Sequence, residues 1–203
     1  MDYQAHWENV YRNKEPWEVS WTQDEPKTSL AFIHSFNLSK SAAIIDIGGG
    51  DSKLVDYLIS EGYNDITVLD ISANAIARAK KRLGELAESI NWVVCDITSF
   101  QPERNYKLWH DRATFHFLTM EEQIVKYLKV ARQAVDHEGF VTMGTFSING
   151  PNKCSGLDIR QYSEETLSAQ LHNGFDKIRC ITEDHITPSK IKQNFLFCSF
   201  RRI

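Results

Sequence analysis

The sequence has few cysteines, no membrane-length apolar run and no excess of positive charge. Its four cysteines, Cys95, Cys154, Cys180 and Cys198, are scattered and form no CxxC pair. Two of them lie inside apolar, strand-like runs, so we predict reduced thiols in a cytoplasmic protein. No apolar segment approaches the roughly 20 residues of a membrane span, and the polar, aromatic N-terminus predicts no signal peptide. The formal net charge of −4 offers no general attraction for nucleic acid or an anionic membrane, so we expect neither as a partner.

Internal repeats, low-complexity tracts and linkers are also absent. The 203 residues therefore predict a single domain, 1–203, which at this length buries roughly 70% of its unfolded surface. Hydrophobic residues make up 42% of the chain and charged residues 25%, as in an ordinary globular protein.

A short apolar run that ends in three glycines is the most informative stretch. Branched residues surround Asp46 in the run 44–47, and the glycines at 48–50 are followed at once by Asp-Ser. Branched side chains suit a strand covered on both faces, and glycines let the chain turn sharply while a ligand touches its backbone. About twenty residues later a second apolar run ends at Asp70, where a carboxylate can accept hydrogen bonds from both hydroxyls of a ribose. The pair predicts a site for a nucleoside-containing cofactor.

The spacing of the glycines distinguishes between nucleotide cofactors. A dinucleotide fingerprint requires glycine at the first, third and sixth positions of the turn, and Lys53 stands at the sixth. The missing glycine is the one that lets the helix pack closely on the strand, so its absence argues against a nicotinamide or flavin cofactor. No Gly-Lys-Ser/Thr follows the turn, which excludes a phosphate-binding P-loop.

The remainder of the chain alternates strand and helix. Ser72 and Ser163 are predicted helix N-caps, Gly84 a helix end, and Thr119 with Glu122 a capping box. The predicted strands are 43–47, 66–69, 90–95, 106–110, 140–146, 175–184 and 193–201, and we expect the 147–162 segment to be a functional loop.

These strand ends resemble the motifs of the class I S-adenosylmethionine (SAM) methyltransferases. In that family an acid in the first strand precedes Gly-x-Gly, as Asp46 does, and the second strand ends in a ribose-binding acid, as at Asp70. A third strand ends in an acid near the adenine amine, as at Asp96, and the catalytic face follows a fourth strand, here 108–112 (Leu-Trp-His-Asp-Arg). The resemblance runs from about residue 40 to the C-terminus. It is to small bacterial methyltransferase-domain proteins of the type 12 kind.

The fold that this resemblance implies is α/β. We expect a Rossmann-like sheet of seven mostly parallel strands, with the last strand antiparallel and helices on both faces. Residues 41–203 would form this SAM-binding core.

Residues 1–40 are rich in aromatic side chains, among them Trp7, Trp17 and Trp21. The run 20–23 (Ser-Trp-Thr-Gln), with Pro26, resembles the lid segment of bacterial small-molecule methyltransferases and, more loosely, of thiopurine methyltransferases. We therefore predict a lid over the cofactor and acceptor. The alternative is that these aromatics only cover one edge of the sheet.

The cofactor implied by the resemblance is SAM, with S-adenosylhomocysteine (SAH) as product. Asp70 would hold the ribose, Ile71 would pack on the adenine and Asp96 would accept from its amine. The full predicted cofactor set is Trp21, Asp46, Gly48, Gly49, Gly50, Ser52, Asp70, Ile71, Asp96, Ile97 and His110.

The predicted catalytic residues are Asp111, Arg112 and His116, after the fourth strand. His110 or Asp111 would face the amino group of SAM. His116 is a candidate general base, because imidazole titrates near neutral pH, or it only finishes a turn. Arg112 is a candidate clamp for an acidic acceptor, or it pairs with a neighbouring acid. Two histidines six apart without a third ligand make a poor metal site, so we predict none.

The sequence favours methyl transfer to a small-molecule acceptor by a monomer or homodimer. A protein-lysine N-methyltransferase is the alternative within this class. A dinucleotide-dependent oxidoreductase and a SAM-binding module without catalysis are alternatives of another class.

Overall fold

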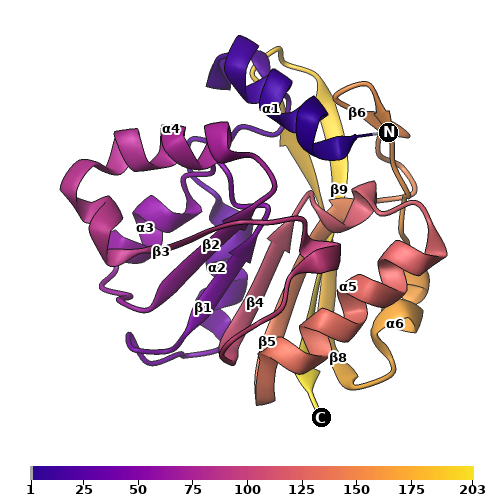
Figure 1. Cartoon of the computed structure of the whole chain (residues 1–203). Helices are drawn as coiled ribbons and strands as arrows, with labels where there is room; N and C mark the ends of the chain where they lie inside the picture. The colour runs from indigo at the N-terminus through magenta and orange to yellow at the C-terminus, as the bar shows by residue number, and fades with distance from the viewer. Residues whose placement is uncertain (1) are drawn as a thin grey trace.

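The computed structural model describes residues 2–203 and is centred on a sheet of seven strands (Figure 1). The strand order is β3-β2-β1-β4-β5-β9-β8, and β9 runs antiparallel to both β5 and β8. The other pairs, β1 with β2 and β4, β2 with β3, and β4 with β5, are parallel. The predicted fold class is confirmed. The strands are β1 (Ile44–Ile47), β2 (Ile66–Asp70), β3 (Asn91–Val94), β4 (Tyr106–Arg112), β5 (Val135–Phe146), β8 (Phe175–Ile186) and β9 (Lys192–Arg202).

Six helices accompany the sheet in residues 2–203: α1 (Tyr3–Asn13), α2 (Lys27–Ser35), α3 (Leu54–Ser60), α4 (Ala73–Leu83), α5 (Glu121–Ala134) and α6 (Glu164–Leu171). Apolar side chains of α2 and α3 share one core with β1 and β2, whereas those of α5 and α6 pack with β4, β5 and β9 on the opposite face. Figure 1 shows α1 across the upper edge of the sheet, beside α4. Within the described part of the chain, none of these helices has the length and apolar character needed to cross a bilayer.

Neighbouring residues of β1 point into different cores, as the period of a strand requires. Ile44 belongs to the core under α2 and α3, and Ile45 to the core under α5 and α6. Every residue of β1 is buried, as expected for a strand covered on both faces. This burial explains why three of its four residues are isoleucine.

Three of the four predicted helix ends are confirmed. Ser72 Oγ accepts a hydrogen bond from Ala75 N at 3.2 Å, Ser163 Oγ accepts from Thr166 N at 3.2 Å, and α4 ends at Gly84 with φ of +59°. The predicted Thr119–Glu122 capping box is wrong. Helix α5 instead begins after Met120, whose backbone N–H donates to the Gln123 side chain at 3.3 Å, so the box is shifted by one residue.

The segment 147–162 carries a two-stranded hairpin, β6 (Lys153–Cys154) with β7 (Leu157–Asp158). It brings Cys154, a buried residue, against the aromatic cluster of Phe32, Phe146 and Phe195. The segment is therefore folded over the end of β5 and β9.

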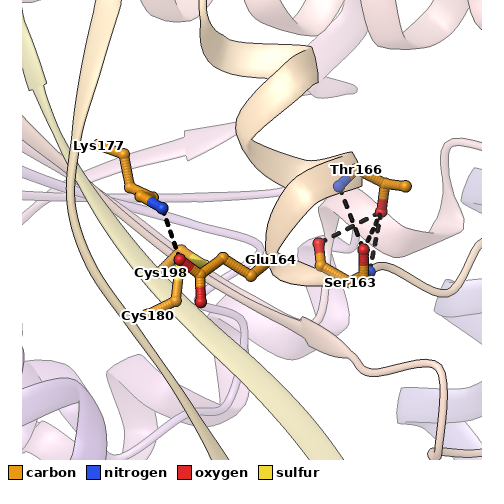
Figure 2. The surroundings of a disulfide bond; sticks show 6 residues. All are labelled: Ser163, Glu164, Thr166, Lys177, Cys180 and Cys198. Atoms are coloured by element: carbon orange, nitrogen blue, oxygen red, sulfur yellow. Dashed lines mark hydrogen bonds and ion pairs between the residues drawn. A yellow bond between two sulfur atoms is a disulfide. The ribbon is translucent and has the colours of Figure 1, made fainter.

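The prediction of four reduced thiols is wrong for one pair. Cys180 of β8 and Cys198 of β9 form a disulfide between directly opposed residues of the antiparallel ladder (Figure 2). Their Cα atoms lie 4.1 Å apart. Sequence spacing gives no signal for such a pair, because the register of the two strands alone brings the residues together. Cys95 and Cys154 are free.

A buried hydrogen-bond chain supports the end of β4. Trp109 Nε1 donates to Tyr127 Oη at 2.8 Å, and Tyr127 Oη donates to Asp111 Oδ2 at 2.6 Å. Asp111 Oδ1 accepts from the backbone N–H groups of Thr114 and Phe115, at 3.0 and 3.2 Å. Each of the three side chains is fully buried, so the chain fixes the turn that follows β4.

Replacement of Tyr127 by phenylalanine should therefore destabilise the fold. The change leaves Asp111 Oδ2 and Trp109 Nε1 buried without this partner, and we expect a loss of about 1–3 kcal/mol in the free energy of unfolding. Urea titration monitored by circular dichroism measures the change. Tyr57→Phe is the matched control, because the Tyr57 hydroxyl donates only to the Asp24 carbonyl near the surface. Equal stability of Tyr127→Phe and the wild type would show that the chain carries no net stabilisation.

Candidate functional site

The cleft of the molecule lies at the carboxyl ends of β1, β2 and β4, where ligands of such sheets bind. It consists of two adjoining pockets that share Tyr11, Trp21, Gly48 and Arg112. The first, which we call the aromatic pocket, has a volume of about 120 Å³ and contains Asp70 and Asp96. The second, the polar pocket, has a volume of about 550 Å³ and contains Asp46, Ser52 and His110.

The glycine turn after β1 forms the floor between the two pockets. Gly48 has φ of +64°, and a Cβ there would lie 1.8 Å from Thr114 Oγ1. Gly50 has φ of +42°, and its Cβ would lie 2.7 Å from Asp70 Oδ2. Any larger residue would be strained at both positions and would push into the side chains that border the cleft. Gly48 and Gly49 thus bring backbone, rather than side chains, to the cleft.

Two carboxylates stand at the ends of neighbouring strands. Asp70 closes β2, is 5% exposed, and accepts from Ser72 N at 2.8 Å through Oδ1. Burial raises the pKa of Asp70 to about 7, against the lowering effect of the Ser72 N–H. Asp96 follows β3 and accepts from Thr98 N and Thr98 Oγ1 through Oδ1, at 2.8 and 2.7 Å. Both acids line the aromatic pocket, as do Ile71 and Ile97.

A buried polar chain supports the turn from the other side. Asp46 Oδ1 lies 2.7 Å from His110 Nδ1, and His110 Nε2 lies 2.8 Å from Ser29 Oγ. The three side chains come from β1, β4 and α2, and each is 3% exposed or less. This chain ties the N-terminal segment to the centre of the sheet, and it explains why His110 borders the polar pocket without pointing freely into it.

Arg112, the last residue of β4, lines both pockets. Its Nη1 donates to the carbonyl oxygen of Trp21 at 2.9 Å, and its guanidinium carbon lies 4.9 Å from the centroid of the Phe195 ring. Nε and Nη2 are buried without a hydrogen-bond partner. Burial lowers the pKa of Arg112 to about 10, with the charge of Glu183 acting in the opposite direction. The side chain remains a cation at neutral pH.

Aromatic residues of the N-terminal segment cover the aromatic pocket. The ring of Trp7 lies 5.6 Å from that of Trp21 and 5.0 Å from that of Phe117, and Tyr11 lies 6.3 Å from Trp21. These rings leave a volume below the roughly 300 Å³ at which ligand pockets usually begin. Trp17 takes no part, because it is 68% exposed.

Helix α1 is fastened to the cleft by Glu8. The Glu8 carboxylate accepts from Ala73 N at 2.7 Å, from Asn74 N at 3.1 Å and from Ser72 Oγ at 3.0 Å. Burial favours the protonated form of Glu8, but these donors outweigh it and lower its pKa. A carboxylate at the N-terminus of α4 is also stabilised by the helix dipole. Glu8 therefore holds α1 next to Asp70.

Most of the residues predicted from the sequence come together in this cleft. Those of the aromatic pocket are Trp21, Gly48, Asp70, Ile71, Asp96, Ile97 and Arg112, and those of the polar pocket are Trp21, Asp46, Gly48, Gly49, Ser52, His110 and Arg112. Gly50 borders neither pocket and acts instead through its close approach to Asp70.

Two of the predicted catalytic residues lie outside both pockets. Asp111 is fully buried, and its oxygens are used by Tyr127 and by the turn after β4; burial raises its pKa to about 6. His116 is also fully buried, stacks on Phe146 at 4.7 Å and accepts from Phe146 N at 3.3 Å. Burial lowers the pKa of His116 to about 3, with Arg112 adding to the effect. Both side chains are taken up by contacts within the fold, and neither borders the two pockets; a catalytic role for them stays a prediction.

Several lining residues carried no signal in the sequence. Thr114 lies against Gly48, and its Oγ1 donates to Ile47 O at 3.2 Å. Gln123 and Cys154 reach the aromatic pocket from α5 and from the hairpin β6–β7. Such contacts depend on tertiary packing and have no local pattern. Tyr11 lies in the aromatic-rich segment 1–40, where no local feature distinguishes it from the other aromatic residues.

A family model described as "Methyltransferase domain" matches residues 44–139. The match covers just under half of the chain, and over these residues the chain resembles a methyltransferase domain. The matched stretch begins at β1 and contains the glycine turn, Asp70, Asp96 and Arg112, but it ends at residue 139, whereas the predicted resemblance continued to the C-terminus. The segment that carries Trp7, Tyr11 and Trp21 lies outside it.

Curated relatives of this domain are distant. Malonyl-[acyl-carrier protein] O-methyltransferase 1 of Ilyobacter polytropus is 27% identical over 116 residues, which are 57% of this chain and 41% of the relative. The eEF1A lysine and N-terminal methyltransferase of Mus musculus is 24% identical over 132 residues, 64% of this chain and 19% of that protein. The aligned part thus spans less than half the length of each.

The fold of the methyltransferase domain is also seen in solved structures. The 1,6-didemethyltoxoflavin-N1-methyltransferase of Burkholderia thailandensis, with bound 1,6-didemethyltoxoflavin and SAH, has a TM-score of 0.75. It is 18% identical, and the superposition covers 98% of this chain and 87% of that one. At this identity the likeness concerns the fold.

Removal of the Glu8 carboxylate should loosen α1 without unfolding the sheet. In Glu8→Ala, the amides of Ala73 and Asn74 lose a charged partner, and we expect the amides of α1 to exchange about tenfold faster or more. Hydrogen–deuterium exchange read by mass spectrometry checks this, with the α5 amides as internal reference. Glu122→Ala is the control, since Glu122 pairs only with Lys126 on the exposed face of α5. Unchanged exchange in α1 would mean that the aromatic contacts alone hold it.

Proposed function

We propose that the chain is a SAM-dependent methyltransferase that transfers a methyl group to a small-molecule acceptor. The observation that carries the proposal is the arrangement of Asp70 and Asp96 at successive strand ends beside a glycine turn, within one cleft. The family match to residues 44–139 supports methyl transfer.

The residues of the cleft fit this cofactor. Gly48 and Gly49 bring backbone to the cleft at points where a Cβ would clash with Thr114 or Asp46, and Asp70 adds an acceptor suited to a ribose diol. Asp96 keeps Oδ2 for an exocyclic amine, because its local bonds use Oδ1. Ile71 and Ile97 supply apolar walls for a base. Together these residues would hold the nucleoside part of SAM.

SAM supplies a methyl group already activated as a sulfonium, so no metal or acid is needed to activate it. The protein's own task is to bind, orient and exclude water. Trp7, Trp21 and Phe117 enclose the aromatic pocket, which keeps an acceptor's lone pair free of solvent. Neither Asp111 nor His116 reaches the cleft as a base, so the acceptor would have to present a lone pair that is already available at neutral pH.

The N-terminal segment acts as a lid in this proposal. The aromatic pocket has a volume of only about 120 Å³ while α1 is in place, so α1 would move outward to admit a ligand there and return to close the cleft. This movement would break the hydrogen bonds between the Glu8 carboxylate and the N-terminus of α4.

A lysine side chain on a protein is the second candidate acceptor. It is favoured by the likeness to the eEF1A lysine and N-terminal methyltransferase. A small molecule is preferred because the cleft is enclosed by α1 and the hairpin β6–β7. Oligomeric state, monomer or homodimer, stays a prediction. So does the cytoplasmic location, against which the Cys180–Cys198 disulfide weighs.

Two measurements test the function. Calorimetry should detect binding of SAH and none of NADH, and Asp70→Ala should weaken SAH binding at least about tenfold, since a bond to a charged group contributes about 1.5–3 kcal/mol. Incubation with methyl-labelled SAM and a lysate split by size should then label the small-metabolite fraction. Label confined to a protein band would favour the lysine candidate. NADH binding without SAH binding would overturn the proposal, and SAH binding without any label would leave a binding module.

The raised pKa of Asp70 makes cofactor affinity depend on pH. The ribose hydroxyls donate, so the bound state favours ionised Asp70, and binding releases a proton wherever the free protein holds one. With a pKa of about 7, SAH affinity should rise about tenfold from pH 6 to pH 8 and level off above it. Asp70→Asn should bind more weakly and lose this dependence. A flat wild-type profile in calorimetry would contradict the assigned role of Asp70.

A further inference from the structure

The two unpartnered nitrogens of Arg112 form one functional edge. Nε and Nη2 lie on the same side of the guanidinium, where their N–H bonds run parallel and match the two oxygens of a carboxylate. Both atoms are buried without a partner, whereas Nη1 is taken by the Trp21 carbonyl. A buried charged donor without a partner is costly and uncommon, which marks this edge as a place for a ligand.

The rest of the side chain is held in position. Nη1 is anchored at 2.9 Å, and the Phe195 ring lies 4.9 Å from the guanidinium carbon. Among residues 2–203 no carboxylate lies within ion-pair distance of Arg112, although Glu183 contributes to its electrostatic environment. The guanidinium is thus held through Nη1, while its Nε–Nη2 edge is free to bind a planar anion.

The neighbours of Arg112 indicate which ligand it meets. Phe195 belongs to β9 and Cys154 to the hairpin β6–β7, so the guanidinium is set among elements on the β5 side of β4. Asp70 and Asp96, which are assigned to the cofactor, stand on the other side of β1, at the ends of β2 and β3. The free edge is therefore placed at the acceptor end of the cleft rather than at the nucleoside end.

We propose that Arg112 is the specificity-determining residue for an acidic acceptor, whose carboxylate it binds through Nε and Nη2. This inference rests on the proposed methyl transfer and adds a substrate class to it. One guanidinium with Glu183 in its surroundings balances a single negative charge, which suits a carboxylate better than a phosphate dianion. The carboxylate of SAM itself offers the same chemistry, so the test has to separate the two sources.

The experiment divides the small-metabolite extract by anion exchange before incubation with methyl-labelled SAM. Wild-type enzyme should label the retained, anionic fraction, also after treatment of that fraction with alkaline phosphatase. Arg112→Gln should lower this labelling at least tenfold, and Arg112→Lys should restore part of it, because it keeps the charge without the fork. The affinity for SAH, measured by calorimetry, should change less than threefold in both variants.

Arg179→Gln is the matched control. Arg179 also lies over a phenylalanine, 4.1 Å from the Phe32 ring centroid, and donates to a backbone carbonyl, that of Ala31 at 3.4 Å, but it borders neither pocket. Its substitution removes a stacked arginine without touching the cleft, so labelling should stay at the wild-type level. Melting temperatures of all variants show which of them are folded.

Three results would overturn the inference. Label drawn from the unretained fraction, and undiminished in Arg112→Gln, would exclude an acidic acceptor and leave methyl transfer intact. Loss of labelling by phosphatase treatment would point to a phosphate instead. A tenfold loss of SAH affinity in Arg112→Gln, with unchanged binding of methylthioadenosine, which lacks the amino-acid part, would assign the edge to the cofactor. Absence of label from every fraction would contradict the proposed function itself.

Discussion

The buried contact between Asp46 and His110 is the interaction on which the geometry of the cleft depends. The two residues are register partners on β1 and β4, and their side chains lie 2.7 Å apart in a region with almost no solvent. The second carboxylate oxygen of Asp46 leaves no room for a Cβ at Gly49, which would meet it at 2.6 Å. One side chain therefore sets the spacing of two strands and the path of the glycine turn. Because Ser29 bonds the other nitrogen of His110, both ring nitrogens have partners, which is the condition under which a buried imidazole is tolerated.

Enclosure and access are in conflict in this cleft. The rings of Trp7 and Trp21 line the aromatic pocket and leave it a volume of about 120 Å³. A rigid core element could not resolve the conflict. Helix α1 can, because its polar attachment is concentrated in Glu8 and its apolar contacts are those of Val10 and of a few aromatic edges. A contact made by few groups opens locally at a lower free energy than global unfolding.

The sequence allowed the sheet and the nucleoside end of the cleft to be predicted because both depend on short-range patterns. Asp70 and Asp96 follow apolar runs, and the end of a parallel strand is where a ligand meets such a sheet. The sequence did not allow us to predict which side chains at the end of β4 reach the cleft, and the reason is physical. Asp111 and Arg112 are successive residues of β4, so Asp111 points into the core while Arg112 faces the cleft; the chain then turns at Ala113, whose φ is +70°, before the buried His116. No local pattern reports a single left-handed residue other than glycine. The Cys180–Cys198 bond and the Glu8 contact were missed for a related reason, since both join elements whose proximity only the complete fold determines.

The two acids of the aromatic pocket and Arg112 lie on opposite sides of β1. Asp70 and Asp96 lie on the β2 and β3 side, and Arg112 lies on the β4 side near β9. If the acids and the arginine were adjacent they would pair, and neither would be free for a ligand. Separation leaves each short of a partner, and the burial of Asp70 is made tolerable by a pKa near neutrality, which lets it lose its charge when no donor is present. The same low-dielectric surroundings that make an unpaired Arg112 unfavourable would strengthen its bond to a carboxylate once one enters. The unpaired Asp70 and Arg112 lower the stability of the free protein, and a ligand that pairs with them would recover that free energy on binding. The N-terminal aromatic residues favour this by limiting solvent access to the cleft.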